Sequence, residues 1–261
     1  MFDGFIEFVR EIYGTNDFIP LHEPRFLGNE KKYLMDTIDS TFVSSVGKYV
    51  DDFESAVAEY TGANYAIATV NGTASLHTAL VLAGVQNNDE VITQSLTFVA
   101  TCNAIRYCNA EPVFVDVSKN TLGLSADSMS AFLEESCEIR NDGFCWNKHS
   151  NKIIRACVPM HTFGFPVQLD EISNLCQRYN ITLVEDAAES LGSTYKEKHI
   201  TATAKVKHKW AFEHDEVGFN YRLPNLNAAL GLTQMESLPK ILEEKRIVAE
   251  KYQEWGKANG I

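Results

Sequence analysis

The chain has 261 residues, of which 45% are hydrophobic and 11% aromatic, and this length and composition suit one large α/β domain or two smaller ones. Its formal net charge of -12 argues against a nucleic-acid-binding protein, whose surface would be basic. No apolar stretch is long enough to span a membrane, and the six cysteines lack metal-ligand spacing, so we expect a cytoplasmic protein with no metal site.

The N-terminal region predicts three helices. In residues 1–11 acidic side chains interrupt the apolar run, which is unlike a secretory signal and typical of a short amphipathic helix. Its apolar face consists of Phe2, Phe5, Ile6 and Val9. Residues 30–41 and 48–61 predict two more helices, the first with Asn29 as its N-cap.

Strand and helix patterns then alternate. The predicted strands are residues 65–70, 90–93, 112–117, 153–159 and 182–185. The predicted helices are residues 74–83, 98–109, 125–135 and 169–179. This alternation predicts βαβ units, and therefore an α/β fold with a mainly parallel sheet and helices on both faces. Residues 141–151 are polar and predict an exposed loop, and residues 225–259 predict a long helix interrupted at Pro239.

The first candidate site residue is Asp186, which follows the apolar strand at residues 182–185. In parallel sheets ligands bind beyond the carboxyl ends of strands, and a carboxylate there can hold a buried cation such as a protonated pyridine nitrogen. Asp186 and Glu189 can equally cap the next helix, because Asp is common at strand-to-helix junctions. This segment alone leaves both interpretations open.

A second candidate is the turn around Gly72 and Thr73, which opens the helix at residues 74–83. Gly72 permits close backbone approach, and Thr73 offers a hydroxyl beside the free N–H groups of the first turn, as in a phosphate site. A plain N-cap formed by Asn71 or Thr73 explains the same residues.

Two further residues lie at the same predicted rim of the sheet. Phe98 begins the helix after the second strand, where an aromatic ring either stacks on a flat ligand or belongs to the core. His161 follows the strand at residues 153–159, where it either joins a site or satisfies backbone groups.

Five motifs in order connect these fragments. They occupy residues 71–77, 97–101, 158–164, 185–190 and 218–225. Together they resemble the DegT/DnrJ/StrS family of pyridoxal-phosphate-dependent sugar aminotransferases, and the resemblance covers most of the chain, residues 18–238. Residues 18–24 and 40–48 are most similar to the subgroup from the legionaminic acid and bacillosamine pathways.

The resemblance implies a domain organisation and a cofactor. Residues 46–238 would form the large domain of a fold type I pyridoxal-phosphate transferase. Residues 1–45 would be an N-terminal helical segment, and residues 239–261 the start of a C-terminal small domain. The cofactor would be pyridoxal 5′-phosphate, with its phosphate held by Gly72 and Thr73.

The remaining cofactor contacts follow from the same resemblance. Phe98 would stack on the cofactor ring, Asp186 would pair with the ring nitrogen, and Glu189 would lie near the phenolic oxygen. With the nitrogen protonated, the ring can accept electron density from the reacting carbon. Asp186 and His161 are therefore the catalytic candidates.

The implied reaction transfers an amino group from glutamate to a UDP-linked 4-keto-6-deoxy amino sugar, for bacterial surface-glycan biosynthesis. In the family, the motif at residues 218–225 reaches into the neighbouring subunit. Asn220 would contact the partner's phosphate and Arg222 the substrate or the interface, so the protein would be a homodimer with shared active sites. Alternatively, both residues only order the turn before the helix that begins after Pro224.

One family element is missing. The family bonds its cofactor to a lysine in a Ser-Phe-x-x-x-Lys segment after the motif at residues 185–190, and no such segment occurs in this chain. The lysines present there lie in polar sequence typical of a solvated surface: Lys196, Lys198, Lys205, Lys207 and Lys209.

Two explanations of the missing lysine are open. Either a lysine-bearing segment is skipped near residues 199–201, or the chain is a lysine-less relative that binds pyridoxal phosphate or a nucleotide sugar without turnover. We favour the first explanation, because a sheet cannot easily lose an interior strand. It predicts a break in the chain path between Lys198 and Thr201.

Overall fold

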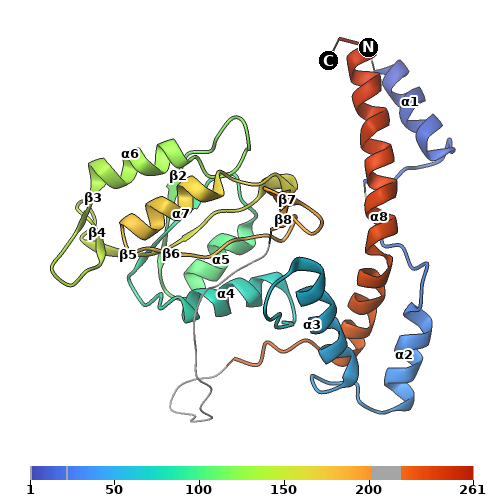
Figure 1. Cartoon of the computed structure of the whole chain (residues 1–261), viewed down its shortest axis with the longest axis horizontal. Helices are drawn as coiled ribbons and strands as arrows, with labels where there is room; N and C mark the ends of the chain where they lie inside the picture. Colours follow the sequence, from blue (N-terminus) through green and yellow to red (C-terminus); the bar gives the residue numbers. More distant parts are fainter. Residues whose placement is uncertain (1, 22, 201–218, 261) are drawn as a thin grey trace. The chain divides into compact units, whose positions relative to one another are not determined.

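Figure 1 shows a computed structural model of the chain, which describes residues 2–21, 23–200 and 219–260. The chain forms two compact units. We call residues 1–53 with 225–261 the helical unit, and residues 54–224 the sheet unit.

The helical unit contains α1 (Asp3–Tyr13), α2 (Glu30–Asp39), the first residues of α3 (Lys48–Thr61) and the long α8 (Asn225–Ala258). α8 continues through Pro239, so the prediction that this proline interrupts the helix is wrong. A proline removes only its own N–H donor, and the hydrogen bonds of the turns on either side maintain the helix.

The start of α2 differs chemically from the prediction. Asn29 precedes the helix, but its side chain makes no capping hydrogen bond. Its Nδ2 instead donates to Glu236 Oε2 on α8 at 2.9 Å. Glu30 Oε2 accepts from the N–H of Gly28 at 2.8 Å, so an acidic side chain orders the entry to the helix.

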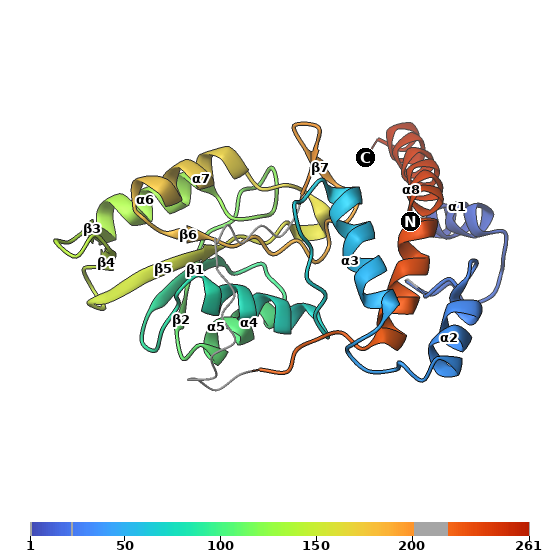
Figure 2. The same ribbon diagram turned by 60° about the horizontal axis from the view of Figure 1, so that its bottom comes forward.

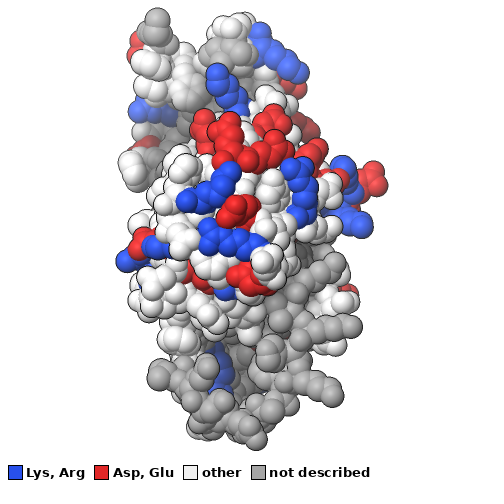
Figure 3. Space-filling model, turned by 90° about the vertical axis from the view of Figure 1, so that its left-hand side faces the viewer, with Lys and Arg blue, Asp and Glu red and all other residues white. Residues whose placement is uncertain are grey.

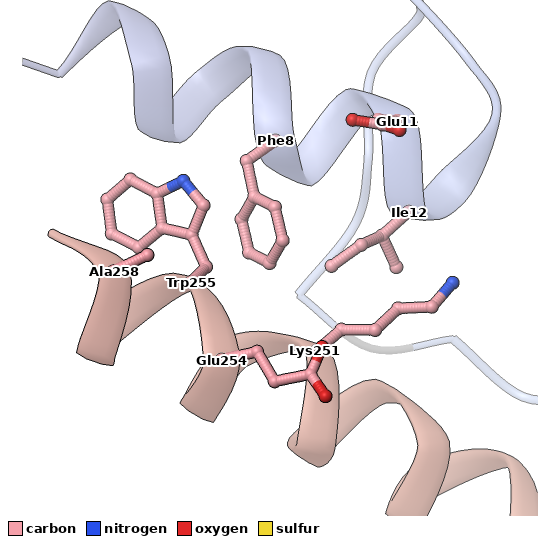
Figure 4. A pocket seen from close by; sticks show the side chains of 7 residues that line it. All are labelled: Phe8, Glu11, Ile12, Lys251, Glu254, Trp255 and Ala258. Atoms are coloured by element: carbon pink, nitrogen blue, oxygen red, sulfur yellow. The ribbon is translucent and has the colours of Figure 1, made fainter.

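Aromatic rings join α1 to α8. Phe5 and Phe8 lie against Trp255 with ring centroids 5.2 and 5.3 Å away, which explains why the predicted amphipathic helix forms here. Figure 4 shows the hollow beside this contact, lined by Phe8, Glu11, Ile12, Lys251, Glu254, Trp255 and Ala258. None of the predicted site residues lines it.

The sheet unit is built on a six-stranded sheet of order β2-β1-β5-β4-β3, with β6 paired to β5. The strands are β1 (Glu90–Gln94), β2 (Glu111–Val115), β3 (Cys137–Ile139), β4 (Cys145–Asn147), β5 (Lys152–Val158) and β6 (Thr182–Leu183). The pairs β1–β2, β1–β5 and β5–β6 are parallel, and β4 pairs with β5 and β3 in antiparallel fashion. The predicted mainly parallel α/β fold is confirmed.

Helices cover both faces of this sheet, with α4 and α5 on one side and α6 and α7 on the other (Figure 2). They are α4 (Gly72–Leu82), α5 (Val99–Tyr107), α6 (Ala126–Ser136) and α7 (Leu169–Arg178). Successive residues of β1 point to opposite faces, so Val91 packs in the core cluster with Leu80 and Ile105, whereas Ile92 packs in the cluster with Met129. Both clusters consist of buried apolar side chains, which fixes the strand register.

Two local predictions are wrong. Residues 65–70 form no strand: Thr69 makes an isolated bridge to Arg222, and the Tyr65 and Ile67 side chains are 87% and 69% exposed. Residues 141–151 are not only a loop, because they include β4, which pairs with β3 and β5. Short hairpin strands carry few residues, so their periodicity is too weak to read from sequence.

A second short hairpin consists of β7 (Thr194–Tyr195) and β8 (Lys198–His199). Lys196 and Glu197 adopt positive φ in its turn, as a two-residue hairpin turn requires. The chain path is described as far as Ile200, and the junction with Thr201 lies outside the described residues, so the predicted break stays a prediction.

On the molecular face in Figure 3, basic and acidic side chains intermingle. In the sheet unit Arg140 pairs with Glu138 at 2.8 Å, and Arg178 pairs with Glu134 at 3.0 Å. This mixture differs from the single-sign surfaces that bind nucleic-acid backbones. Within the described ranges, no helix combines the length and apolar character needed to cross a membrane.

Candidate functional site

Several polar side chains gather where β1, β5 and β6 end, at one edge of the parallel sheet. Gln94 is the last residue of β1 and is fully buried. Its Nε2 lies 3.0 Å from the carbonyl oxygens of Leu96 and Met160 and 2.9 Å from Thr162 Oγ1. Its Oε1 accepts from the N–H groups of Leu124 and Met160. Gln94 therefore locks together the loops that follow β1 and β5.

Asp186 lies just beyond β6 and is only 5% exposed. The Thr101 hydroxyl, fully buried on α5, donates to Asp186 Oδ2 at 2.7 Å, and the Ala188 N–H donates to Oδ1 at 3.2 Å. The backbone continues the sheet here, because the Asp186 N–H donates to the Pro159 carbonyl and His161 N–H donates to the Asp186 carbonyl. A buried carboxylate with two neutral donors retains acceptor capacity for a cation.

His161 is fully buried, and its backbone N–H donates to the backbone carbonyl of Asp186. Its Nδ1 is 3.2 Å from the N–H of Val167 and therefore accepts, which leaves the proton on Nε2. Nε2 lies 3.1 Å from Glu185 Oε2 and donates to it. Both ring nitrogens are thus engaged, and the imidazole connects the loops after β5 and β6.

Glu189 is exposed and accepts from the N–H of Phe163 through Oε2 at 2.7 Å. Phe163 has φ 55° in the 3-10 turn Thr162–Gly164, a conformation uncommon for a bulky residue. The next position requires a glycine. Gly164 has φ 80°, and an added Cβ would lie 2.9 Å from the Glu189 carbonyl oxygen. Glu189 therefore fixes the turn that carries Phe163 at the rim.

The start of α4 has the form of an anion cradle. The Asn71 side chain accepts from the Ala74 N–H at 2.9 Å, and the Asn71 carbonyl accepts from Ser75 N–H at 3.1 Å. Gly72 and Thr73 precede these bonds, so their N–H groups have no partner in the helix. Around Gly72, no heavy atom of the described chain lies within 4 Å of an added Cβ. The N-cap and phosphate interpretations are therefore compatible, because Asn71 caps the helix while Gly72 and Thr73 offer the free N–H groups.

The segment at residues 219–223 runs alongside residues 68–70. The Val70 N–H donates to the Tyr221 carbonyl at 2.7 Å. Phe219 and Tyr221 stack with centroids 5.3 Å apart, and Tyr221 Oη lies 3.2 Å from Nδ1 of the buried His77. Burial lowers the pKa of His77.

Alternation along this extended segment places Asn220 and Arg222 on the face opposite Tyr221. Both side chains are exposed, so within this chain they are not brought into contact with the Asp186 carboxylate. Gly218, which begins the motif, lies outside the described residues.

Phe98 is the residue before α5, and its ring is 66% exposed. It belongs to a set of exposed apolar side chains on the loops after the strands and at the start of α5: Leu96, Phe98, Val99, Phe163, Phe165 and Leu191. The ring is not in the core, so the core interpretation of Phe98 is wrong and its face is available for contact.

Thr101 and Gln94 are the site residues that the sequence interpretation did not assign. Thr101 lies within a motif that carries the resemblance, and a Thr three residues into a helix behind a strand end could have suggested a partner for Asp186. Gln94 ends the apolar run of β1, and a buried amide at such a position signals a polar hub.

Three of the described lysines form ion pairs: Lys48 with Asp52, Lys196 with Asp170, and Lys240 with Glu244. Lys205, Lys207 and Lys209 lie outside the described residues. Over the described ranges, no cluster of three His, Cys, Asp or Glu side chains could hold a metal ion. Five of the six cysteines are buried and all six are free, as expected for small apolar core residues.

The residues present fit pyridoxal phosphate in three respects. The backbone at Gly72 is open to a phosphate, Asp186 offers a buried carboxylate to a pyridinium nitrogen, and the exposed Phe98 ring offers a stacking face. All three residues belong to the sheet unit: Gly72 begins α4, Phe98 lies between β1 and α5, and Asp186 follows β6.

Comparison with known proteins agrees with this chemistry. The sequence model of the DegT/DnrJ/EryC1/StrS aminotransferase family matches residues 26–209 and 202–255. GDP-perosamine synthase of Escherichia coli O157:H7 is 30% identical, over 90% of this chain and 70% of that protein. The putative pyridoxal phosphate-dependent aminotransferase EpsN of Bacillus subtilis (strain 168) is 32% identical, over 90% of this chain and 67% of that protein.

A solved structure shares the fold. The chain superimposes on a DegT DnrJ EryC1 StrS aminotransferase from Brucella abortus with a TM-score of 0.76 and 21% identity, over 88% of this chain and 69% of that one. The aligned region contains length differences, since the match to the E. coli protein extends over 274 positions but uses only 90% of a 261-residue chain.

Proposed function

Because the chain belongs to the DegT/DnrJ/EryC1/StrS aminotransferase family, we propose that it is an enzyme that uses pyridoxal phosphate to transfer an amino group from glutamate to a nucleotide-linked keto sugar. The observation that carries the proposal is the buried carboxylate of Asp186, held by two neutral donors beyond the end of a parallel strand. When bound, pyridoxal phosphate supplies an electron sink and an amino-group carrier.

The chain's own residues divide the binding work. The free N–H groups of Gly72 and Thr73 bind the phosphate, aided by the positive end of the α4 dipole. Asp186 holds the proton on the ring nitrogen, and Phe98 covers the ring with its exposed face. We assign His161 a positioning role beside Asp186, because both of its ring nitrogens are already engaged.

The sugar substrate is proposed to be a UDP-linked 4-keto-6-deoxy amino sugar, used for bacterial surface polysaccharide. Three relatives are named GDP-perosamine synthase, so a GDP-linked keto sugar is the competing substrate. A panel of UDP- and GDP-linked 4-keto-6-deoxy sugars, with glutamate as donor and product mass as readout, separates the two. Turnover of the GDP-linked sugars alone would contradict the UDP assignment.

We propose a homodimer with shared sites. The exposed apolar side chains around Phe98, Phe163 and Phe165 form a rim that a second copy would cover. Asn220 and Arg222 are exposed and free to reach a partner's site. Sedimentation should show a dimer, and Phe165→Glu should shift it toward monomer while Phe26→Glu, an exposed aromatic in the helical unit, should not. A stable wild-type monomer with full cofactor occupancy would refute the shared sites.

A lysine-bearing segment near residues 199–201, ahead of the motif at residues 218–225, is proposed to belong to the intact protein. Three observations support it. The two parts of the family match overlap at residues 202–209, as expected if the family has additional sequence there. The alignment with the E. coli relative extends over 274 positions but uses only 90% of this 261-residue chain, so it contains gaps opposite this chain. Residues 65–70 have a strand-like sequence but expose Tyr65 and Ile67, as an unpaired strand would.

Intact mass and a visible absorption spectrum of protein purified from its native source test this proposal. Additional mass corresponding to about 40 residues, the size of a crossover with its strands, together with an absorption band of lysine-bonded cofactor, is the expected result. A mass equal to the printed sequence would favour the second function, a lysine-less relative that binds the cofactor or a nucleotide sugar without turnover.

A further inference from the structure

Thr101 occupies an unusual place for a helical threonine. In helix interiors a threonine hydroxyl often bonds to a carbonyl of its own preceding turn, as Thr78 of α4 does with the Ala74 carbonyl at 2.8 Å. Thr101 instead donates to Asp186 Oδ2 at 2.7 Å, across 85 residues of sequence. Thr97 Oγ1 in turn donates to Thr101 Oγ1 at 2.9 Å.

We propose that Thr101 is a positioning residue that holds the Asp186 carboxylate ready for the ring nitrogen of the cofactor, with Thr97 as its support. A hydroxyl has one proton to donate, and accepting from Thr97 directs that proton of Thr101 to Asp186. Hydrogen bonds to a charged group are short and strong, and both partners are shielded from water. The inference rests on the proposed cofactor site.

Pyridoxamine 5′-phosphate binding tests this role without requiring a lysine. Thr101→Val keeps the shape of the side chain and removes its hydroxyl. We expect this variant to bind pyridoxamine 5′-phosphate about tenfold more weakly, which corresponds to about 1.4 kcal/mol. Thr101→Ser keeps the hydroxyl and should bind within about twofold of wild type. Thr78→Val is the matched control, because its hydroxyl bonds only within α4, and it should also remain within about twofold.

A double-mutant cycle separates positioning from packing. If Thr101 acts through Asp186, Thr101→Val should cost nothing further in an Asp186→Ala background. The ¹⁵N chemical shift of a labelled cofactor ring should report a loss of ring-nitrogen protonation in Thr101→Val and its recovery in Thr101→Ser. An equal loss of affinity in both backgrounds, or no loss in either, would overturn the inference. Failure of the wild type to bind pyridoxamine 5′-phosphate would instead overturn the proposed function itself.

Discussion

Replacing Asp186 by Asn separates the two energetic roles of this carboxylate. Asn has nearly the same shape and keeps an oxygen that can accept from Thr101. It loses the negative charge, and its amide cannot accept from the Ala188 N–H. Asp186 is 5% exposed and forms no ion pair with any residue that the structure describes. In the cofactor-free protein, no opposite charge therefore compensates the free-energy cost of removing this carboxylate from water.

The cofactor-free stability should therefore change little. A lost hydrogen bond to a charged group costs about 1.5–3 kcal/mol, and removal of a buried charge that has no ion-pair partner among the described residues offsets it. Cofactor binding should change much more, because a hydrogen bond to a charged group contributes about 1.5–3 kcal/mol, or roughly 10- to 100-fold in Kd. At a pyridoxamine 5′-phosphate concentration 100 times the wild-type Kd, ligand stabilisation should fall from about 2.7 kcal/mol to about 0.4–1.4 kcal/mol.

Urea denaturation with and without pyridoxamine 5′-phosphate measures both quantities. Asp127→Asn is the control, because Asp127 is an exposed carboxylate in the first turn of α6 and its loss lowers the net negative charge by the same amount. Equal ligand stabilisation of wild type and Asp186→Asn would refute the assignment of Asp186 to the ring nitrogen. A large loss of cofactor-free stability would refute the offset between hydrogen bond and buried charge.

Three further predictions follow from the sheet unit. Gly72→Ala should leave stability within about 1 kcal/mol of wild type but weaken pyridoxamine 5′-phosphate binding measurably by calorimetry. The control Gly4→Ala on α1 should also keep stability within about 1 kcal/mol and should leave binding unchanged. Unchanged binding in Gly72→Ala would contradict the cradle. Gly123→Ala should destabilise the protein by about 1–3 kcal/mol in urea titrations, because its Cβ would lie 2.5 Å from Val167 Cγ1; a neutral effect would contradict this packing. Because the pKa of His77 is lowered in the folded protein, the unfolded chain takes up the proton more readily, and the free energy of unfolding should fall as pH drops below about 6.5. His77→Phe should flatten this pH dependence. Parallel pH profiles of the wild type and the variant would contradict the prediction.

The fold was predictable where hydrophobic periods are long. β1 and β5 are largely buried strands, and α6 is preceded by its N-cap Ser125, whose side-chain oxygen accepts from the Ser128 N–H at 3.2 Å. The prediction of a strand at residues 65–70 failed because a strand requires a neighbour as well as a pattern. Within the described chain, the Val70 N–H and the Ala68 carbonyl bond to residues 221–223, and the Ala68 N–H bonds to the Glu54 carboxylate. The hairpin of β3 and β4 was not predicted, because three-residue strands are too short to show a hydrophobic period.

The candidate site divides in the same way. Strand-end carboxylates and a glycine at a helix start can be read from the sequence, because local geometry places them. The contacts of Asp186 with Thr101, and of Gln94 with Met160 and Leu124, depend on how the elements come together. Which nitrogen of His161 carries the proton likewise depends on the N–H of Val167, which only the folded loop supplies.

Transfer of isotope from donor to acceptor tests the central claim most directly. Protein from its native source would be incubated with pyridoxal phosphate, ¹⁵N-labelled glutamate and the panel of UDP- and GDP-linked 4-keto-6-deoxy sugars. Our account predicts a nucleotide sugar that carries the ¹⁵N label, with equimolar formation of the keto acid from glutamate. Stoichiometric binding of pyridoxamine 5′-phosphate with no label in any sugar would contradict an aminotransferase and identify a protein that binds the cofactor without turnover.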